Sequence, residues 1–244
     1  MKNIILLSLL FLLVGCRNYF FNKWLDRYGA YDNEIQLSKY TNDTKDVVFI
    51  PMIHLAIPDK YEAVRMKVDS LGKEGYYFYW EKVKSVSDND TILRKFRKIL
   101  NFPLASNGYS EVFSASIMDK YNLKFKKNVI DQPPYEELGL DSLNSENVDS
   151  NITDMVNFYE NEFGKIELEP CDFETKVTES SPCENENWDR EKKDSVIIDY
   201  RNSVVIENLT KESKNKIAIV YGSDHIKGMA ALLLEQGYRL QDEN

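Results

Sequence analysis

The spacing of hydrophobic residues along this 244-residue chain predicts an alternation of strands and helices. Short runs rich in β-branched and aromatic residues are typical of buried strands, and they lie at 47–50, 76–80, 125–130, 217–221 and 238–240. Elsewhere apolar residues recur every three or four positions, as on the buried face of a helix. These helical segments run over 58–71, 91–100, 152–163, 189–209 and 229–234, and the polar stretch 141–150 is interpreted as a loop.

This alternation predicts an α/β fold in which helices flank a central sheet that is mostly parallel or mixed. Two segments share one order: a hydrophobic strand, a three-residue turn, a histidine, a helix, Gly-Tyr and another strand. The first segment contains His54 and reaches Gly75-Tyr76, and the second contains His225 and reaches Gly237-Tyr238. We interpret them as two strand-turn-His-helix-strand units, related by a diverged internal repeat, from which the layered fold is built.

The start of the chain is typical of a bacterial signal peptide. Lys2 precedes an apolar run over 4–14, which is shorter than the roughly 20 residues that span a bilayer. The run ends in Leu13-Val14-Gly15-Cys16, which resembles a lipobox, and this predicts acyl chains such as palmitate on Cys16. The alternative is an ordinary signal peptide with an incidental cysteine. The expected organisation is a signal peptide (1–15), a lipidated tether or first packing segment (16–30) and a single domain (31–244).

Composition and cysteine usage fit a folded protein of the bacterial cell envelope. The net charge of −9 provides no basic surface for nucleic acid, so the expected partners are a membrane and a peptide or small-molecule substrate. The residue after Cys16 is Arg17 and not an aspartate, and this favours a location in the outer membrane, facing the periplasm. An oxidising compartment permits a disulfide between Cys171 and Cys183, with two free thiols as the alternative. The basic residues of the predicted helix 91–100 are interpreted as solvated surface.

Three residues of types that bind divalent metals follow predicted strands. His54 and His225 come after hydrophobic strands, and Glu81 comes directly after the aromatic one. The carboxyl ends of neighbouring parallel strands meet at one edge of a sheet, where these side chains can converge. Two imidazoles and a carboxylate are suited to manganese, cobalt or zinc, and a metal-bound water is a nucleophile near neutral pH. Asp224 is a further candidate ligand, or an acceptor that orients an imidazole.

The alternative for each of these residues is structural: a histidine at a helix start or in the core, and Glu81 paired with a lysine. A serine hydrolase is disfavoured because the chain contains no Gly-x-Ser-x-Gly. Ser223 is adjacent to Asp224 and His225 in the chain, but a catalytic triad is assembled by the fold and not by adjacency in sequence.

Gly222-Ser223-Asp224-His225, followed by an Ala/Leu-rich helix and Gly237-Tyr238, resembles the C-terminal Gly-x-x-His block of the TraB/PrgY/GumN and Tiki proteins. That family belongs to a wider group with the erythromycin esterase and ChaN-like proteins. His54 and Glu81 occupy the places of the family's first histidine and its glutamate, and Arg201-Asn202 resembles its Arg-Asn helix. The resemblance covers 46–82 and 190–240. Pro51 stands where the family's first motif has glycine.

The resemblance implies a metal-dependent hydrolase, with peptidase activity known for Tiki members. His54, His225 and Glu81 would form the site, with Glu81 as metal ligand or general base. Arg201 would line the site and stabilise an anionic transition state. The expected function is therefore a lipid-anchored hydrolase that acts outside the cytoplasm. The alternatives are a non-catalytic lipoprotein that binds a metal or haem, and a structural lipoprotein that keeps the same fold.

Overall fold

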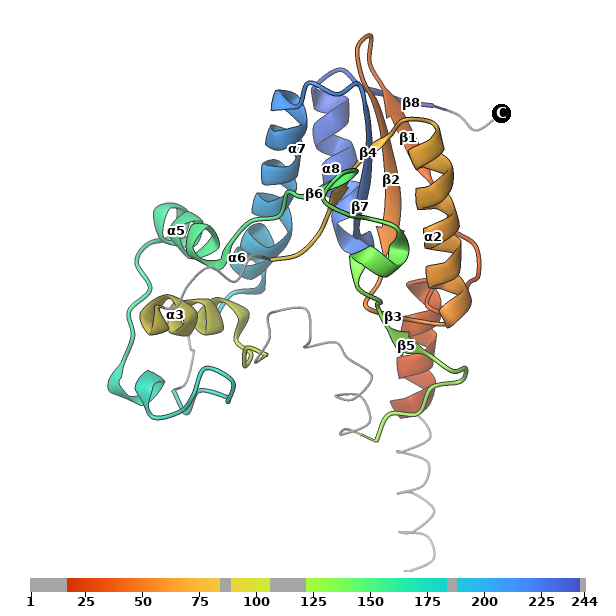
Figure 1. Ribbon diagram of the computed structural model, residues 1–244. Helices are drawn as coiled ribbons and strands as arrows, with labels where there is room; N and C mark the ends of the chain where they lie inside the picture. Colours follow the sequence, from red (N-terminus) through yellow and green to blue (C-terminus); the bar gives the residue numbers. More distant parts are fainter. Residues whose placement is uncertain (1–16, 84–88, 106–121, 184–187, 242–244) are drawn as a thin grey trace, which may run out of the picture.

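Short, strongly hydrophobic segments form the centre of an α/β fold, as their pattern predicts (Figure 1). The computed structural model describes residues 17–83, 89–105, 122–183 and 188–241, so the predicted signal peptide and Cys16 lie outside the described residues. The strands are β1 (Ser38–Thr41), β2 (Asp46–Met52), β3 (Leu55–Ala56), β4 (Tyr77–Trp80), β5 (Ile130–Asp131), β6 (Ser145–Asn147), β7 (Lys216–Gly222) and β8 (Arg239–Leu240).

Residues 17–27 form a first helix, whose Leu25 is buried, so this segment packs on the fold. The later helices are α2 (Pro58–Lys73), α3 (Asp90–Leu100), α5 (Ile152–Phe163), α6 (Arg190–Asp194), α7 (Arg201–Lys211) and α8 (Ser223–Glu235). A π-helix, Ser195–Tyr200, joins α6 to α7, and two short 3-10 helices lie at Tyr135–Leu138 and Pro170–Phe173. Among the described residues, no helix is both long and apolar enough to cross a membrane.

The main sheet has six strands in the order β6-β4-β7-β2-β1-β8, and β3 pairs with β5 in a separate two-stranded sheet. Strands β6, β4, β7 and β2 are parallel, whereas β1 is antiparallel to both β2 and β8. Met52 is aligned with Gly222, and Trp80 with Val220, so the carboxyl ends of β2, β4 and β7 reach the same edge. This edge carries the candidate site.

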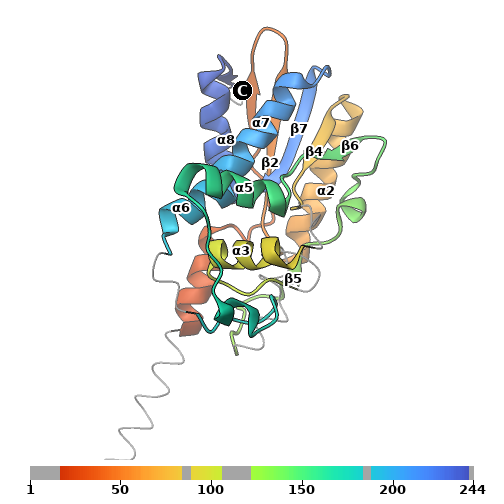
Figure 2. The same ribbon diagram turned by 90° about the vertical axis from the view of Figure 1, so that its left-hand side faces the viewer.

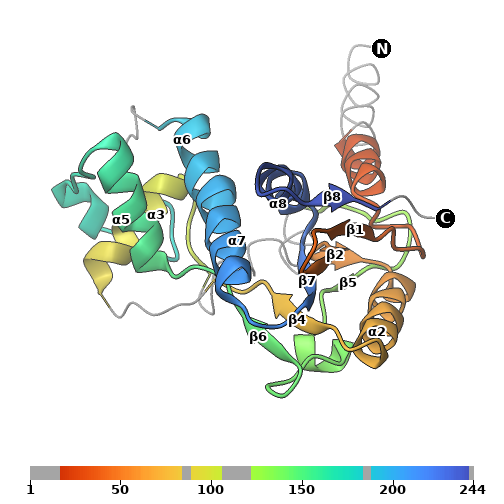
Figure 3. The same cartoon turned by 90° about the horizontal axis from the view of Figure 1, so that it is seen from above.

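Alternate residues of the central strands face two different helical layers, as the two-residue period of a strand requires. In β2, Val47 and Phe49 belong to the core beneath α7 and α8, whereas Val48 and Ile50 belong to the core beneath α2. Figure 3 shows α2 on one side of the sheet and α7 and α8 on the other. The central strands are therefore buried on both faces, which explains their continuous hydrophobic character.

A second group of helices, which includes α3 and α5, lies on one side of this sandwich and faces the viewer in Figure 2. It has its own core, in which Phe96 of α3, Met155 of α5 and Val196 of the π-helix are fully buried. The structure contains a disulfide between Cys171 and Cys183, the pair that the sequence singles out, with their Cα atoms 5.6 Å apart. It closes a loop that packs against α3.

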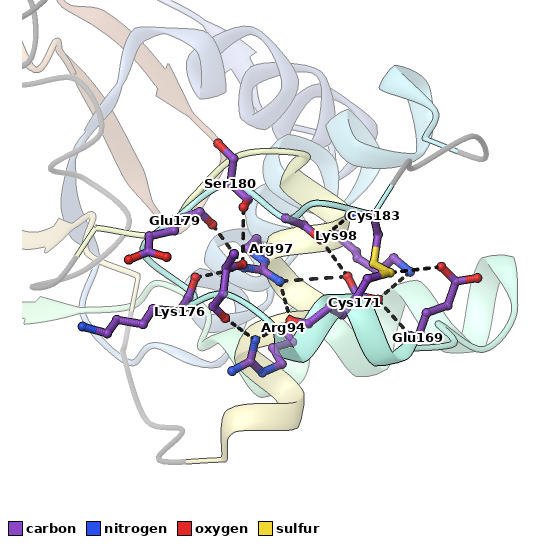
Figure 4. A network of polar contacts seen from close by, with 12 residues as sticks. Arg94, Arg97, Lys98, Glu169, Cys171, Lys176, Glu179, Ser180 and Cys183 are labelled. Carbon is purple, nitrogen blue, oxygen red and sulfur yellow. Dashed lines mark hydrogen bonds and ion pairs between the residues drawn. A yellow bond between two sulfur atoms is a disulfide. The ribbon is translucent and has the colours of Figure 1, made fainter.

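The interpretation of the basic residues of α3 as solvated surface is wrong for Arg94 and Arg97. Arg97 is only 2% exposed and donates to the carbonyls of Asp172, Lys176 and Glu179, and Arg94 also donates to the carbonyl of Asp172 (Figure 4). The disulfide loop has little regular structure, and the two guanidinium groups tie it to α3 by donating hydrogen bonds to its carbonyls.

Other elements also differ from the predictions. The strand expected over 125–130 is wrong in extent, because only Ile130–Asp131 pairs, and the expected loop 141–150 contains the edge strand β6. The helix expected over 229–234 begins earlier, at Ser223, so His225 lies in its first turn. Strands β1 and β3 were not predicted. All of these are short strands or polar segments, in which hydrophobic periodicity carries little information.

The π-helix changes which side of the long helix is buried. An uninterrupted α-helix over 189–209 predicts that Ile197, Tyr200, Val204 and Asn208 share one face, with Arg201 beside them. In the structure the wider π turn rotates the following residues, so Asn208 is exposed, whereas Val205 and Leu209 are buried. Arg201, which the prediction places beside that face, is buried, and Asn202 is buried next to it.

We expect Arg97→Met to lower the free energy of unfolding by about 3 kcal/mol, because it removes the hydrogen bonds from Arg97 to the disulfide loop and takes one cationic neighbour from the buried carboxylate of Asp172. Urea denaturation of the full chain measures the change. Lys165→Met is the matched control, since Lys165 is 72% exposed in its ion pair and such pairs contribute little. Equal effects of the two substitutions would contradict the role given to Arg97.

Candidate active site at the carboxyl ends of the parallel strands

Four ionisable side chains gather where the parallel strands end. His54 follows β2, Glu81 follows β4, and Asp149 follows β6. His225 follows β7, in the first turn of α8. The parallel register brings these positions to one edge of the sheet, and α7 packs against that edge and contributes Arg201. The predicted convergence of His225, Glu81 and Arg201 is therefore present in the structure.

Arg201 lies at the centre of the group and is 2% exposed. It holds Asp149 through two hydrogen bonds, from Nε to Oδ1 at 2.8 Å and from Nη2 to Oδ2 at 2.7 Å. Nη2 also donates to Glu81 Oε1 at 2.6 Å, and Nη1 donates to the carbonyl of Ile197 at 3.2 Å. Although burial opposes its charge, these carboxylates raise the pKa of Arg201 well above its ordinary value. The planar guanidinium thus joins β4, β6 and the long helix.

Glu81 is ionised, and both of its oxygens are bonded. Oε2 accepts the backbone N–H of Gly222 at 2.6 Å, while Oε1 accepts from Arg201. Burial alone raises the pKa of Glu81, but the charge of Arg201 and the Gly222 hydrogen bond hold it below its ordinary value. A Cβ at position 222 would lie 2.9 Å from Oε2, so glycine permits this close approach. The close contact with Glu81 therefore explains why glycine is suited to position 222, the first residue of the Gly-x-x-His block.

His225 is held as a neutral imidazole in one orientation. Its Nδ1 lies 2.8 Å from Asn202 Oδ1, which can only accept, so the ring proton is on Nδ1. Nε2 then carries the lone pair, and it accepts from Arg201 Nη1 at 3.2 Å. Burial and the charge of Arg201 lower the pKa of His225 to about 4. The residue that orients this imidazole is Asn202; the predicted acceptor, Asp224, is exposed and instead accepts a hydrogen bond from Tyr28.

His54 lines a cavity of about 180 Å³ at this edge. Burial lowers the pKa of His54, and the nearby charge of Glu81 only partly opposes this effect, so the ring is neutral at pH 7. Ser223, Asp224 and His225 of the first turn of α8 lie in the same wall, with Glu81 and Arg201. The remaining wall is largely apolar and is formed by Trp24, Leu25, Tyr28, Ile53, Ile197 and Ile198.

A larger groove of about 820 Å³ lies in the helical group, beside the disulfide. It is lined by residues such as Lys98, Phe163 and Trp188, and it contains none of the buried ion pairs around Arg201. The smaller cavity at the strand ends is therefore the candidate active site, because it combines apolar walls with convergent polar groups.

The predicted metal ligands do not fit a metal ion in this arrangement. Both ring nitrogens of His225 are bonded, and its lone pair points to the guanidinium of Arg201. Within the part of the chain that the structure describes, only Glu169, Cys171 and Cys183 place three ligand atoms within 4.8 Å of one another, and both sulfurs are in the disulfide. The manganese, cobalt or zinc hypothesis stays a prediction, and the chemistry proposed for this site uses side chains and backbone alone.

Sequence reasoning did not assign a site role to Asp149 or Asn202. Asp149 lies in a segment interpreted as a polar loop, and an acidic residue in such a segment is ordinarily solvated. Asn202 follows Arg201 in the motif quoted for the family, but that motif does not show that its carbonyl oxygen orients His225. The one available signal was the Arg-Asn pair itself, on a helix with an apolar face.

No protein-family model, no curated protein and no solved structure matches this chain. The resemblance to the TraB/PrgY/GumN and Tiki proteins rests on the quoted residues and stays a prediction. Pro51, the departure from the family's motif, lies within β2, where it is aligned with Tyr221. The function is therefore inferred from the geometry of the site.

The low pKa of His225 predicts a pH-dependent stability. When the pH falls below about 6.5, the ordinary pKa of histidine, His225 becomes protonated in the unfolded chain. In the folded chain it becomes protonated only near pH 4. Its contribution to stability is thus complete above pH 6.5 and is lost as the pH falls toward 4. We expect the free energy of unfolding to fall by about 2–3 kcal/mol more in the wild type than in His225→Gln between pH 7 and 4.5. Parallel urea-denaturation curves for the two chains would contradict this assignment.

Gly228 allows α8 to approach Asn202. A Cβ at this position would lie 2.3 Å from Asn202 Nδ2, which has no room to move without disturbing His225. We expect Gly228→Ala to destabilise the fold by about 1–3 kcal/mol, as over-packing does. Gly72→Ala, in α2, is the matched control: its nearest neighbour is 3.8 Å away, and we expect a gain of up to about 1 kcal/mol from helix propensity. Thermal unfolding distinguishes the two, and equal shifts would contradict the close contact.

Proposed function

We propose that this chain is a lipid-anchored hydrolase that acts on an ester or peptide bond outside the cytoplasm, with a water molecule activated by His54. The observation that carries the proposal is the placement of a neutral imidazole beside the N-terminus of α8, in one cavity with Glu81 and Arg201. A general base must be unprotonated at the working pH and within reach of the water that it activates.

The first turn of α8 supplies the complementary group. The first N–H groups of a helix have no partner within the helix, and their partial positive charge stabilises an anion. Ser223, Asp224 and His225 form this turn and line the cavity. A substrate carbonyl placed there would develop its negative charge against backbone donors, which is the arrangement that stabilises a tetrahedral intermediate.

The proposed reaction then follows. His54 takes a proton from water, the resulting hydroxide attacks the carbonyl carbon, and the oxyanion forms against the N–H groups of α8. Collapse of the intermediate breaks the bond to the alkoxide or amine, which leaves with the proton that His54 had taken. Free acid and free alcohol or amine are the products, so protons and electrons balance.

Arg201 has a different role from the one that the resemblance implies. Its guanidinium is bonded to two carboxylates, a carbonyl and an imidazole, so it is a positioning residue. It fixes Glu81, and Glu81 in turn holds Gly222 at the point where β7 becomes α8. The backbone donors of α8 are thereby kept in one geometry.

The location of the activity rests on the sequence of residues 1–16 and on the disulfide. The apolar run and Leu13-Val14-Gly15-Cys16 support a lipid anchor on Cys16, with the outer membrane, facing the periplasm, as the proposed site. A disulfide between Cys171 and Cys183 is in keeping with an oxidising compartment. The acidic chain, with a net charge of −9, offers no reason to include nucleic acid among its partners.

The full chain, tested with chromogenic short-chain esters and with blocked peptides, should turn over one of the two classes, and EDTA should not reduce the rate. We expect His54→Gln to lower kcat/KM by about 10²- to 10⁴-fold, as the loss of a general base does. Because the pKa of His54 is lowered, activity should persist below about pH 6.5 and decline only as the pH falls further.

Thermal unfolding of His54→Gln is the control for loss of the fold. Activity that EDTA abolishes, and that a divalent metal restores, would overturn the side-chain mechanism and establish the predicted metal site. Tight ligand binding without turnover would favour the non-catalytic binder. A cavity of about 180 Å³ is smaller than the roughly 300–1,000 Å³ of typical ligand sites, so such a ligand would be small, or only part of it would enter.

A further inference from the structure

The helix over 17–27 has one buried face and one exposed aromatic face. Leu25 is buried, and Phe21 packs against the same core, with its ring 5.5 Å from that of Phe125. Facing outward, Tyr19 is 62%, Phe20 66% and Trp24 43% exposed, and Tyr28 continues the row just beyond the helix. We refer to Tyr19, Phe20, Trp24 and Tyr28 as the N-terminal aromatic face. In Figure 1 the helix, in red, lies at the level of β3 and β5, at the lower end of the sheet, where the candidate site is.

These rings form two close pairs along the helix. Tyr19 and Phe20 lie 5.6 Å apart between ring centroids, and Trp24 and Tyr28 lie 4.8 Å apart. Isolated exposed aromatic residues are ordinary on a protein surface, but a contiguous group is typical of an interaction site. Tyrosine and tryptophan in particular are enriched where a protein meets the headgroup region of a membrane.

The charge around this face is opposite to that of the whole chain. Segment 122–129 is docked on the helix through Asn22, whose side chain bonds the carbonyl of Lys124 at 2.7 Å and the N–H of Lys126 at 2.8 Å. Residues 17–28 and 122–129 together carry six basic side chains and one acidic one, in a chain whose net charge is −9. The basic residues are Arg17, Lys23, Arg27, Lys124, Lys126 and Lys127.

The helix that carries this surface follows the proposed lipid anchor in the sequence, which makes a membrane the expected partner. Arg17 is the first described residue of this helix, and the residue before it in the sequence is Cys16, the proposed lipid anchor. If Cys16 carries acyl chains that are inserted in the bilayer, the first turn of the helix lies directly at the membrane surface. Basic side chains attract anionic headgroups, and aromatic rings enter the boundary between headgroups and acyl chains.

We infer that the N-terminal aromatic face, with the basic segment 122–129, rests on the surface of an anionic phospholipid bilayer; this inference rests on the proposed anchoring of Cys16. Trp24 and Tyr28 belong both to this face and to the wall of the candidate active site. The contact therefore places the cavity beside the headgroups, where an amphiphilic ester or acylated peptide can reach it without leaving the membrane surface.

Bromolipid quenching of tryptophan fluorescence tests the contact in the full mature chain, reconstituted in vesicles of phosphatidylethanolamine and phosphatidylglycerol. The chain has three tryptophans, Trp24, Trp80 and Trp188. Lipids brominated near the headgroup should quench the wild type, and Trp24→Phe should remove most of that quenching. Trp188→Phe is the matched control, since Trp188 is also partly exposed but lies beside the larger groove, and it should leave the quenching intact.

A second pair of variants separates the surface from the anchor. Tyr19→Ser with Phe20→Ser should reduce quenching of Trp24 at least twofold, whereas Leu143→Ser, at an 89% exposed residue elsewhere, should not. Replacing phosphatidylglycerol by phosphatidylcholine should also reduce it. Equal quenching of wild type and Trp24→Phe, or no effect of lipid charge, would overturn the inference. Mass spectrometry of the N-terminal peptide tests the anchor independently, so an acylated, vesicle-bound chain with unquenched Trp24 contradicts the surface alone.

Discussion

A permanently charged guanidinium lies almost out of contact with water at the carboxyl edge of the sheet, and the arrangement of that edge depends on it. Burying an isolated ion costs several kcal/mol, so Arg201 is tolerable only because Asp149 and Glu81 meet it with near-ideal hydrogen bonds. Those carboxylates come from the ends of β6 and β4, and Glu81 also holds the backbone of Gly222 at the end of β7. Any shift of one strand would separate a buried charge from its partner. The ion pairs therefore select one relative position for the strand ends, and the candidate active site inherits its geometry from that selection.

The elements with long, regular patterns were predictable from sequence. Val47–Ile50 and Ile217–Tyr221 are hydrophobic at every position because both faces of the parallel strands are covered, and Tyr61, Val64, Val68 and Leu71 repeat at the helical period because only one face of α2 is buried. The carboxyl-end rule for parallel strands was also sufficient to bring Glu81 and His225 to one place. These predictions succeeded because the patterns involve residues that are close in sequence and because one force, the burial of apolar side chains, dominates them.

The failures involve polar groups whose partners are distant in sequence. Nothing local distinguishes Arg97, which bonds a loop about 80 positions away, from the exposed lysines near it, and nothing local shows that Asp149 faces Arg201 across 52 positions. The π-helix is a further case, because one wider turn changes which residues face inward without altering the residue types. Metal binding by His54, Glu81 and His225 stays a prediction, and it too depends on neighbours that the sequence does not show, since the lone pair of His225 is directed at Arg201.

The opposite end of the central strands lies away from the buried ion pairs around Arg201. The hairpin that joins β1 to β2, over 42–45, projects from the end of the molecule remote from helix 17–27 and from the strand ends that form the cavity (Figure 1). Its turn is closed by its own side chain, Asn42, which accepts from the backbone of Thr44 and Lys45. If the protein lies on a membrane as proposed, a reporter group or an inserted domain attached to this hairpin would extend away from the bilayer, and it would touch neither the cavity nor helix 17–27.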